Sequence, residues 1–170
     1  MSRNTTPLLL PLLALSLGCA GEVATGPDAG SALLDNQSAP ITRPAGGSCT
    51  TTVTVVTTEP PLTLAIEGVC QLQHLGRTTM VTEERVDLTT GLATNDTRYT
   101  AANGDVLLTR FEGHITAANG PDVAFEGTET YLGGTGRFSD ATGVSALVGS
   151  AVLPGLTGTG AYTTTGTISF

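Results

Sequence analysis

The 170-residue chain contains no lysine and no tryptophan, and aromatic residues make up only 4% of it. Its seven basic side chains are all arginines, and they face fifteen Asp and Glu residues, which gives a formal net charge of −8. A protein that binds nucleic acid needs a basic stripe against the phosphates, and this composition does not supply one. We therefore expect no nucleic-acid partner, and we attribute the acidity to solubility.

Histidine and cysteine are also scarce, with two and three copies. His74 and His114 lie far apart in the chain, and no cluster of Cys and His has the spacing of a zinc site. The sequence also lacks the Gly-x-Ser-x-Gly elbow of many hydrolases. We expect no metal, no cofactor and no hydrolase site.

Only one long hydrophobic run is present, from Pro7 to Leu17, with Arg3 before it and Cys19 shortly after it. A membrane-spanning helix needs about 20 apolar residues, so this run is too short to span. Its length and flanks are typical of a signal peptide over residues 1–18. The residues before Cys19 resemble a bacterial lipobox, which predicts that Cys19 is lipidated. Ser16 departs from that pattern, so cleavage of an ordinary secretory signal nearby is the alternative.

These features predict an exported protein of the cell envelope that contacts the membrane through its lipid anchor. Ala20 after the cysteine resembles the outer-membrane class if the cell is Gram-negative, and secretion without an anchor is the alternative. Residues 19–47, rich in Ala, Gly, Ser, Pro and Asp, are expected to form the lipidated end and a flexible linker. The remaining residues, 48–170, are expected to form a single domain.

Within that domain, Thr, Val and Gly alternate between turn signals, and no segment has helical apolar spacing. This pattern predicts an all-β fold with eight strands joined by short turns. Such a meander removes its exposed edges by closing into an up-and-down antiparallel β-barrel. The expected strands cover residues 49–58, 62–72, 78–88, 96–102, 105–117, 122–132, 144–153 and 159–169.

The first hairpin has a turn at Pro60-Pro61, which sets the register of its two strands. That register places Thr57 opposite Leu62 and Cys49 opposite Cys70, with the apolar side chains on the inner face. Cysteines directly opposite each other on antiparallel strands are within bridging distance. We predict a Cys49–Cys70 disulfide, which leaves Cys19 unpaired and supports its lipidation.

The segment Tyr131 to Gly143, YLGGTGRFSDATG, is followed by two alternating strands that end at Phe170. It resembles the corresponding stretch of the allene oxide cyclase and dirigent-like β-barrels, and of bacterial secreted proteins of that type. His74 to Arg77 and Asn103 to Asp105 resemble further signatures of the bacterial group. The resemblance implies an eight-stranded barrel with an interior cavity, in a superfamily whose plant members guide or catalyse cyclisation and coupling of hydrophobic small molecules. The plant enzymes' functional residues do not match numbered positions here.

Glu84 and Glu129 are the candidates for chemistry inside the barrel. Glu84 alternates in step with Met80 and Val86, and Glu129 in step with Phe125 and Tyr131. If these faces point inward, two carboxyl groups enter an apolar lumen, where burial raises their pKa. A register slip or a β-bulge would instead place them in water.

His74, Tyr131 and Arg137 are further candidates for ligand binding. Each also has a structural interpretation, in which His74 fixes a turn and Arg137 pairs with a carboxylate. The glycine-rich stretch Gly133 to Phe138 lacks the Lys and Ser/Thr of a phosphate loop, so we interpret it as a turn whose Phe138 fills the core.

Three functions are compatible with these observations. The first is an envelope lipoprotein whose barrel binds a small hydrophobic molecule or serves as a structural surface module. The second is a cyclase or dirigent-type guide that acts on hydrophobic small molecules in the lumen. A transmembrane barrel is the third, and the scarcity of aromatic residues for two girdles weighs against it. We favour the first, and the sequence names no ligand and no oligomeric state.

Overall fold

The computed structural model describes residues 41–170. The predicted signal peptide 1–18, the predicted lipidation site Cys19 and the part of the predicted linker up to residue 40 lie outside the described residues. In the part of the chain that the structure describes, no helix is long and apolar enough to cross a membrane.

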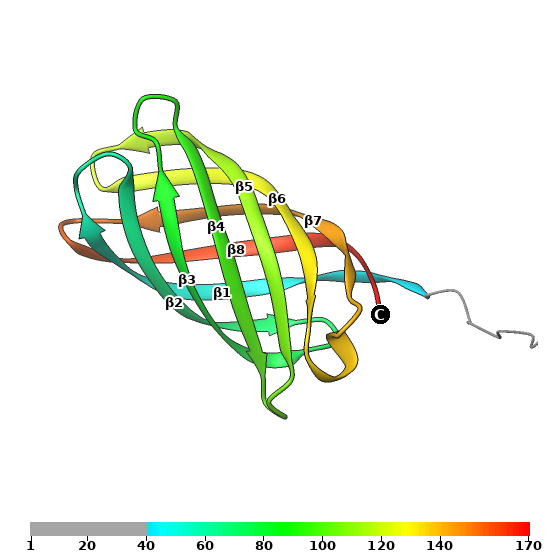
Figure 1. Ribbon diagram of the computed structural model, residues 1–170. Helices are drawn as coiled ribbons and strands as arrows, with labels where there is room; N and C mark the ends of the chain where they lie inside the picture. The colour runs from blue at the N-terminus through cyan, green and yellow to red at the C-terminus, as the bar shows by residue number, and fades with distance from the viewer. Residues whose placement is uncertain (1–40) are drawn as a thin grey trace, which may run out of the picture. The chain divides into compact units, whose positions relative to one another are not determined.

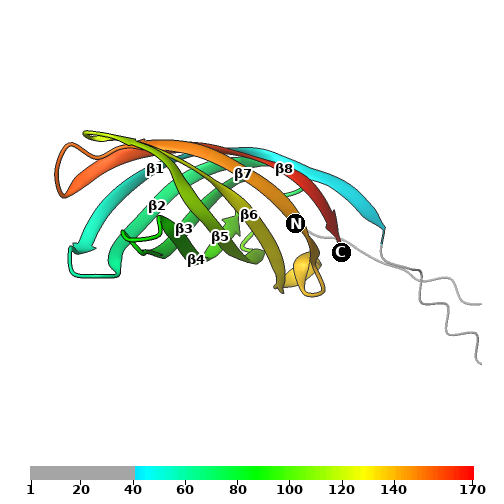
Figure 2. The ribbon, with the colours of Figure 1, turned by 90° about the horizontal axis from the view of Figure 1, so that it is seen from above.

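Eight antiparallel strands follow one another in sequence order and close into a barrel (Figure 1). Each strand pairs with the next, and β1 closes the sheet by pairing with β8. Figure 2 shows β1, β7 and β8 on one side of the barrel and β3 and β4 on the other. The predicted up-and-down barrel is therefore confirmed, with strands β1 Thr42–Thr57, β2 Leu62–Leu72, β3 Gly76–Val86, β4 Leu92–Ala101, β5 Val106–Asn119, β6 Asp122–Gly134, β7 Thr142–Val152 and β8 Thr157–Ser169.

Five strands begin earlier than the sequence predicts, and the difference is largest for β1 and β4. Strand β1 starts at Thr42, inside the predicted linker range 19–47, because Thr42 to Gly47 pair with the end of β8. Because β8 is distant in the sequence, the local pattern of residues in β1 does not reveal this pairing. Strand β4 starts at Leu92 rather than at 96, because its first residues pair with β3 and β5. The prediction missed this start because Asn95 is a residue type that strands usually avoid.

The predicted register of the first hairpin holds from the disulfide to Val55. Cys49 pairs with Cys70 and Val55 with Leu64, and the predicted Cys49–Cys70 disulfide is formed. The pairing of Thr57 with Leu62 was wrong, because the register shifts after Val55 and Thr57 pairs with Thr63. The extra residue there is a β-bulge that the alternation pattern does not reveal.

One end of the barrel, here called the closed end, holds the start of β1, the end of β8 and the 3₁₀ segment η1, Gly136–Phe138 (Figure 1). Phe138 is fully buried there and packs beside Phe170. Gly133 and Gly136 have φ values of 93° and 57°, which favour glycine, so this stretch forms a turn. The opposite end, here called the mouth, carries the β1–β2, β3–β4, β5–β6 and β7–β8 turns.

Candidate functional site

The lumen contains a cavity of about 250 Å³ that extends from the middle of the barrel toward the mouth. Exposed residues of the mouth, such as Leu88 and Ala118, line its outer part, while Tyr99 and Glu129 line its floor. A second space of about 20 Å³ lies beyond that floor and also touches Tyr99 and Glu129. The wall of the larger cavity is mostly apolar and includes Val53, Leu64, Val86, Phe111, Phe125 and Leu147.

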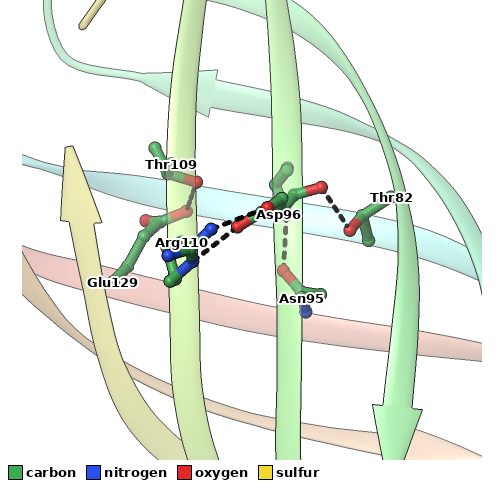
Figure 3. A network of polar contacts seen from close by, with 7 residues as sticks. Thr82, Asn95, Asp96, Thr109, Arg110 and Glu129 are labelled. Atoms are coloured by element: carbon green, nitrogen blue, oxygen red, sulfur yellow. Dashed lines mark hydrogen bonds and ion pairs between the residues drawn. The ribbon is translucent and has the colours of Figure 1, made fainter. Parts of the chain in front are cut away.

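Glu129 on β6 forms the polar centre of the floor and is only 3% exposed. Its Oε1 accepts hydrogen bonds from the Tyr99 hydroxyl at 2.7 Å and from the Thr109 hydroxyl at 2.8 Å (Figure 3 shows the Thr109 contact). The Tyr99 hydroxyl has one hydrogen and donates it to Glu129, so the Tyr162 hydroxyl donates to Tyr99 across 2.8 Å. Tyr99 and Thr109 thus donate directly to the Glu129 carboxyl group, and Tyr162 is linked to it through Tyr99.

Glu84 on β3 lies nearer the mouth, one inward-facing position from Val86. Its Oε2 accepts a hydrogen bond of 2.9 Å from the Asn95 side-chain amide, and Asn95 in turn accepts one of 2.8 Å from Thr97. The glutamate is half-buried and faces the cavity. Both glutamates predicted as lumen residues therefore point inward, and no register slip turns them to water.

Burial changes the acidity of both carboxyl groups. Desolvation raises the pKa of Glu129, and the hydrogen bonds from Tyr99 and Thr109 only partly oppose that rise. Desolvation likewise raises the pKa of Glu84, against the hydrogen bond from Asn95. The pKa of Tyr99 is raised by burial first and by the nearby Glu129 second. The lumen therefore favours neutral forms of its acids until a counter-charge arrives.

Glycine pairs make room for the aromatic wall. Gly113 and Gly127 lie opposite each other on β5 and β6, and the Phe111 ring lies over both. A Cβ added at Gly113 would come within 2.3 Å of the ring, and one at Gly127 within 2.6 Å. These positions need glycine because a side chain at either one would collide with the Phe111 ring and with backbone atoms of the partner strand.

The outer wall carries a different kind of polar contact. Asp96 and Arg110 form an ion pair on the exposed face, at 2.8 Å between Oδ1 and Nε (Figure 3). A shallow depression of about 660 Å³ lies elsewhere on the outer wall, among polar side chains such as Ser48, Gln71 and Arg77. It is open to solvent, so it offers a ligand little burial. Within residues 41–170, no group of three His, Cys, Asp or Glu side chains is arranged to hold a metal ion.

The other predicted ligand residues lie away from the main cavity. His74 is in the β2–β3 turn at the closed end, where its Nε2 donates to the Pro44 carbonyl at 2.9 Å. Arg137 is exposed, donates to the His74 carbonyl and lies 3.9 Å from the Asp105 carboxylate. Tyr131 lines the 20 Å³ space and shares a hydrogen bond with Ser145. The structure thus brings Glu84 and Glu129 into one cavity and keeps these three residues out of it.

Sequence reasoning missed several polar residues of the cavity, among them Asn95, Tyr99 and Tyr162. Asn95 was missed because the fourth strand was predicted to start after it. Tyr99 and Tyr162 both lie on strands that were predicted, and their alternation with Thr97 and Thr164 marks them as inward-facing. The alternation could therefore have identified both tyrosines. Their hydrogen-bond partners, Glu129 on β6 for Tyr99 and Tyr99 on β4 for Tyr162, depend on how the barrel closes.

The fold and the cavity define a class, the closed eight-stranded antiparallel β-barrel with a partly open, largely apolar lumen. Comparison of the chain with protein-family models, with curated proteins and with solved structures finds no match.

Proposed function

We propose that the barrel binds one small, largely apolar molecule in its lumen. The observation that carries this proposal is the cavity of about 250 Å³ among apolar side chains, with only a few polar groups placed in it. Ligand sites have this composition, because apolar walls supply affinity and isolated polar groups supply orientation. An apolar cavity of about 150 Å³ is enough for benzene, so this one accepts a slightly larger molecule.

The mouth supports access by an apolar molecule. Five large apolar side chains are exposed at this end, in or beside three of its four turns. They place apolar surface at the end of the barrel toward which the cavity extends. These residues are Val56, Leu88, Leu92, Val152 and Leu156.

Filling the lumen tests the proposal. Ala151 lines the cavity on β7, and Ala151→Phe would place a ring inside it. In calorimetric titrations with 2-phenylethanol, we expect the wild type to bind and the variant to lose at least roughly tenfold in affinity, about 1.4 kcal/mol. Ala161→Phe is the matched control, because Ala161 is exposed on the outer wall and lines the shallow depression.

Two results would contradict this proposal. If the wild type does not bind, the structural surface module is the better description. If Ala161→Phe weakens binding and Ala151→Phe does not, the site is on the outer wall. Thermal denaturation checks that each variant folds, and Ala93→Leu provides a smaller filling substitution at another position of the cavity.

A second candidate function is a cyclase or dirigent-type guide, to which the sequence resemblance points. The observation that favours it is the presence of Glu84 and Glu129 in one cavity, since acid–base chemistry needs polar groups that converge on the bound molecule. It requires that a bound molecule touch both carboxyl groups. A crystal structure of a complex in which either glutamate lies beyond hydrogen-bond distance of the bound molecule would contradict it.

We also propose that the protein is exported and tethered to the membrane through a lipid on Cys19. The support is the hydrophobic run before Cys19, together with the Cys49–Cys70 disulfide, a bond typical of oxidising compartments. Labelling with palmitate in a bacterial host should mark the wild type and not Cys19→Ser. Equal labelling of both would contradict the anchor and favour the secreted form.

A further inference from the structure

The charges inside the lumen have one sign. Two carboxyl groups line the cavity, and among the residues that the structure describes none of those lining it is basic. The arginines Arg77, Arg85, Arg98, Arg110 and Arg137 are exposed on the outside of the barrel or at its closed end. An ionised carboxylate in an apolar cavity is costly unless a counter-charge pairs with it. The described residues supply no such charge inside the cavity.

Glu84 has hydrogen-bonding capacity that the described residues leave unused. Asn95 donates to its Oε2, and no donor in the described chain reaches its Oε1. No buried side-chain oxygen in residues 41–170 lacks a partner, so the Oε1 atom is accessible from the lumen. A carboxylate has about four acceptor sites, and a ligand that carries N–H groups would occupy those that face the cavity.

Aromatic rings form part of the wall of the same cavity. Phe111, Phe125, Tyr99 and Tyr162 all line the same cavity, although the whole chain has only seven Phe and Tyr residues. Aromatic faces attract cations, and an acid combined with several rings is the usual surround of a bound ammonium group. The cavity therefore combines a carboxyl group, which can pair with an ammonium group, with aromatic rings that also attract an ammonium group.

We propose that the ligand of the lumen is a small apolar amine whose ammonium group pairs with the carboxylate of Glu84. This inference rests on the proposed function and names the class of molecule that the cavity takes. The apolar part of the amine lies against the aromatic and aliphatic wall, and the ammonium donates to Oε1 of Glu84. Binding forms no covalent bond.

Glu84 is the anchor and Glu129 is not, because the two carboxyl groups differ in what they already bind. Glu129 accepts from Tyr99 and Thr109, is almost fully buried and holds the floor together. Glu84 has a single donor, lies closer to the mouth and lines the cavity with its second carboxyl oxygen unpaired among the described residues. An incoming ammonium reaches Glu84 without breaking the Tyr162–Tyr99–Glu129 chain.

Three probes of nearly equal shape test the inference: 2-phenylethylamine, 2-phenylethanol and phenylacetate, titrated at neutral pH and monitored by calorimetry. We expect the amine to bind roughly tenfold more tightly than the alcohol, because its ammonium makes a charge-assisted hydrogen bond. Phenylacetate should bind most weakly, since its carboxylate meets two others. In Glu84→Gln, the amine should fall to the affinity of the alcohol, while the alcohol changes by no more than about twofold.

Glu83→Gln is the matched control, because Glu83 is the next residue on β3, points outward and loses the same charge. It should keep the preference for the amine. Equal affinity for amine and alcohol in the wild type would overturn the inference and leave the proposed function standing. A preference that survives in Glu84→Gln would also overturn it. If no probe binds although the fold is intact, the proposed function fails and this inference with it.

Discussion

At the scale of single residues, the Glu129 carboxyl group lies at the floor of the lumen, where the barrel buries it away from water. Glu129 is stabilised by donors from Tyr99 and Thr109, yet its pKa is still raised because burial outweighs those bonds. The folded protein therefore holds the Glu129 proton more tightly than the unfolded chain does. This difference has a measurable effect on stability.

Stability should fall as pH rises above the ordinary Glu value of 4.5. Below that value both states hold the proton, and between it and the higher folded pKa only the unfolded chain releases it, which favours unfolding. The loss is complete above the folded pKa and amounts to about 1.4 kcal/mol for each unit of the rise. Glu129→Gln should remove this contribution, so its melting temperature should depend less on pH and exceed that of the wild type at alkaline pH.

Comparing the two proteins isolates Glu129, because the other shifted groups are present in both. Glu84 contributes in the same direction and window. Asp87 and Asp96 have lowered pKa values and act only below about 3.8, where stability falls as pH falls. Melting curves of the wild type and Glu129→Gln that run parallel from pH 4 to 9 would contradict a raised pKa for Glu129.

Alternation along the chain was sufficient to place Glu84 and Glu129 inside the barrel. It was not sufficient to assign their partners, since Tyr99, Thr109 and Asn95 reach them across strands. The cavity itself also has no sequence signature, because its volume depends on how glycines such as Gly113 and Gly127 let the Phe111 ring settle.

At the scale of elements, each hairpin is a local unit, and this explains which strands were predicted well. Strand β2 has the predicted bounds, Leu62–Leu72, because a turn precedes it and its alternation is regular. The start of β1 depends on its pairing with β8 at the other end of the chain. The bulge after Val55 lies where β1 runs into the β1–β2 turn at the mouth. Pairing between distant segments was the part that the sequence could not show.

The Cys49–Cys70 disulfide ties the first hairpin together across 21 residues. A cross-link of this span restricts the unfolded chain, so replacing both cysteines by alanine should lower the free energy of unfolding by about 3 kcal/mol. Urea denaturation of the wild type and the double variant measures the difference. Reducing the wild type with dithiothreitol should reproduce most of it. A double variant within about 1 kcal/mol of the oxidised wild type would show that the hairpin does not need the bond.

At the scale of the whole molecule, the two ends of the barrel differ in kind. The closed end holds buried Phe138 and Ile168, together with the start of β1 and the end of β8. The mouth consists of turns with exposed apolar side chains, and it leads to the cavity. The cavity extends toward the mouth and only a space of about 20 Å³ lies toward the closed end, so we expect a ligand to enter at the mouth.

The central claim is that the lumen is the site where a small molecule binds. Its most direct test is a nuclear magnetic resonance measurement of contacts between bound 2-phenylethanol and the protein, using the wild type and Ala151→Phe. We expect contacts from the ring of the probe to Phe111, Phe125 and Leu147 in the wild type, and none of these in the filled variant. Contacts confined to the outer wall around Ser48 and Ala161, or identical contacts in both proteins, would contradict it.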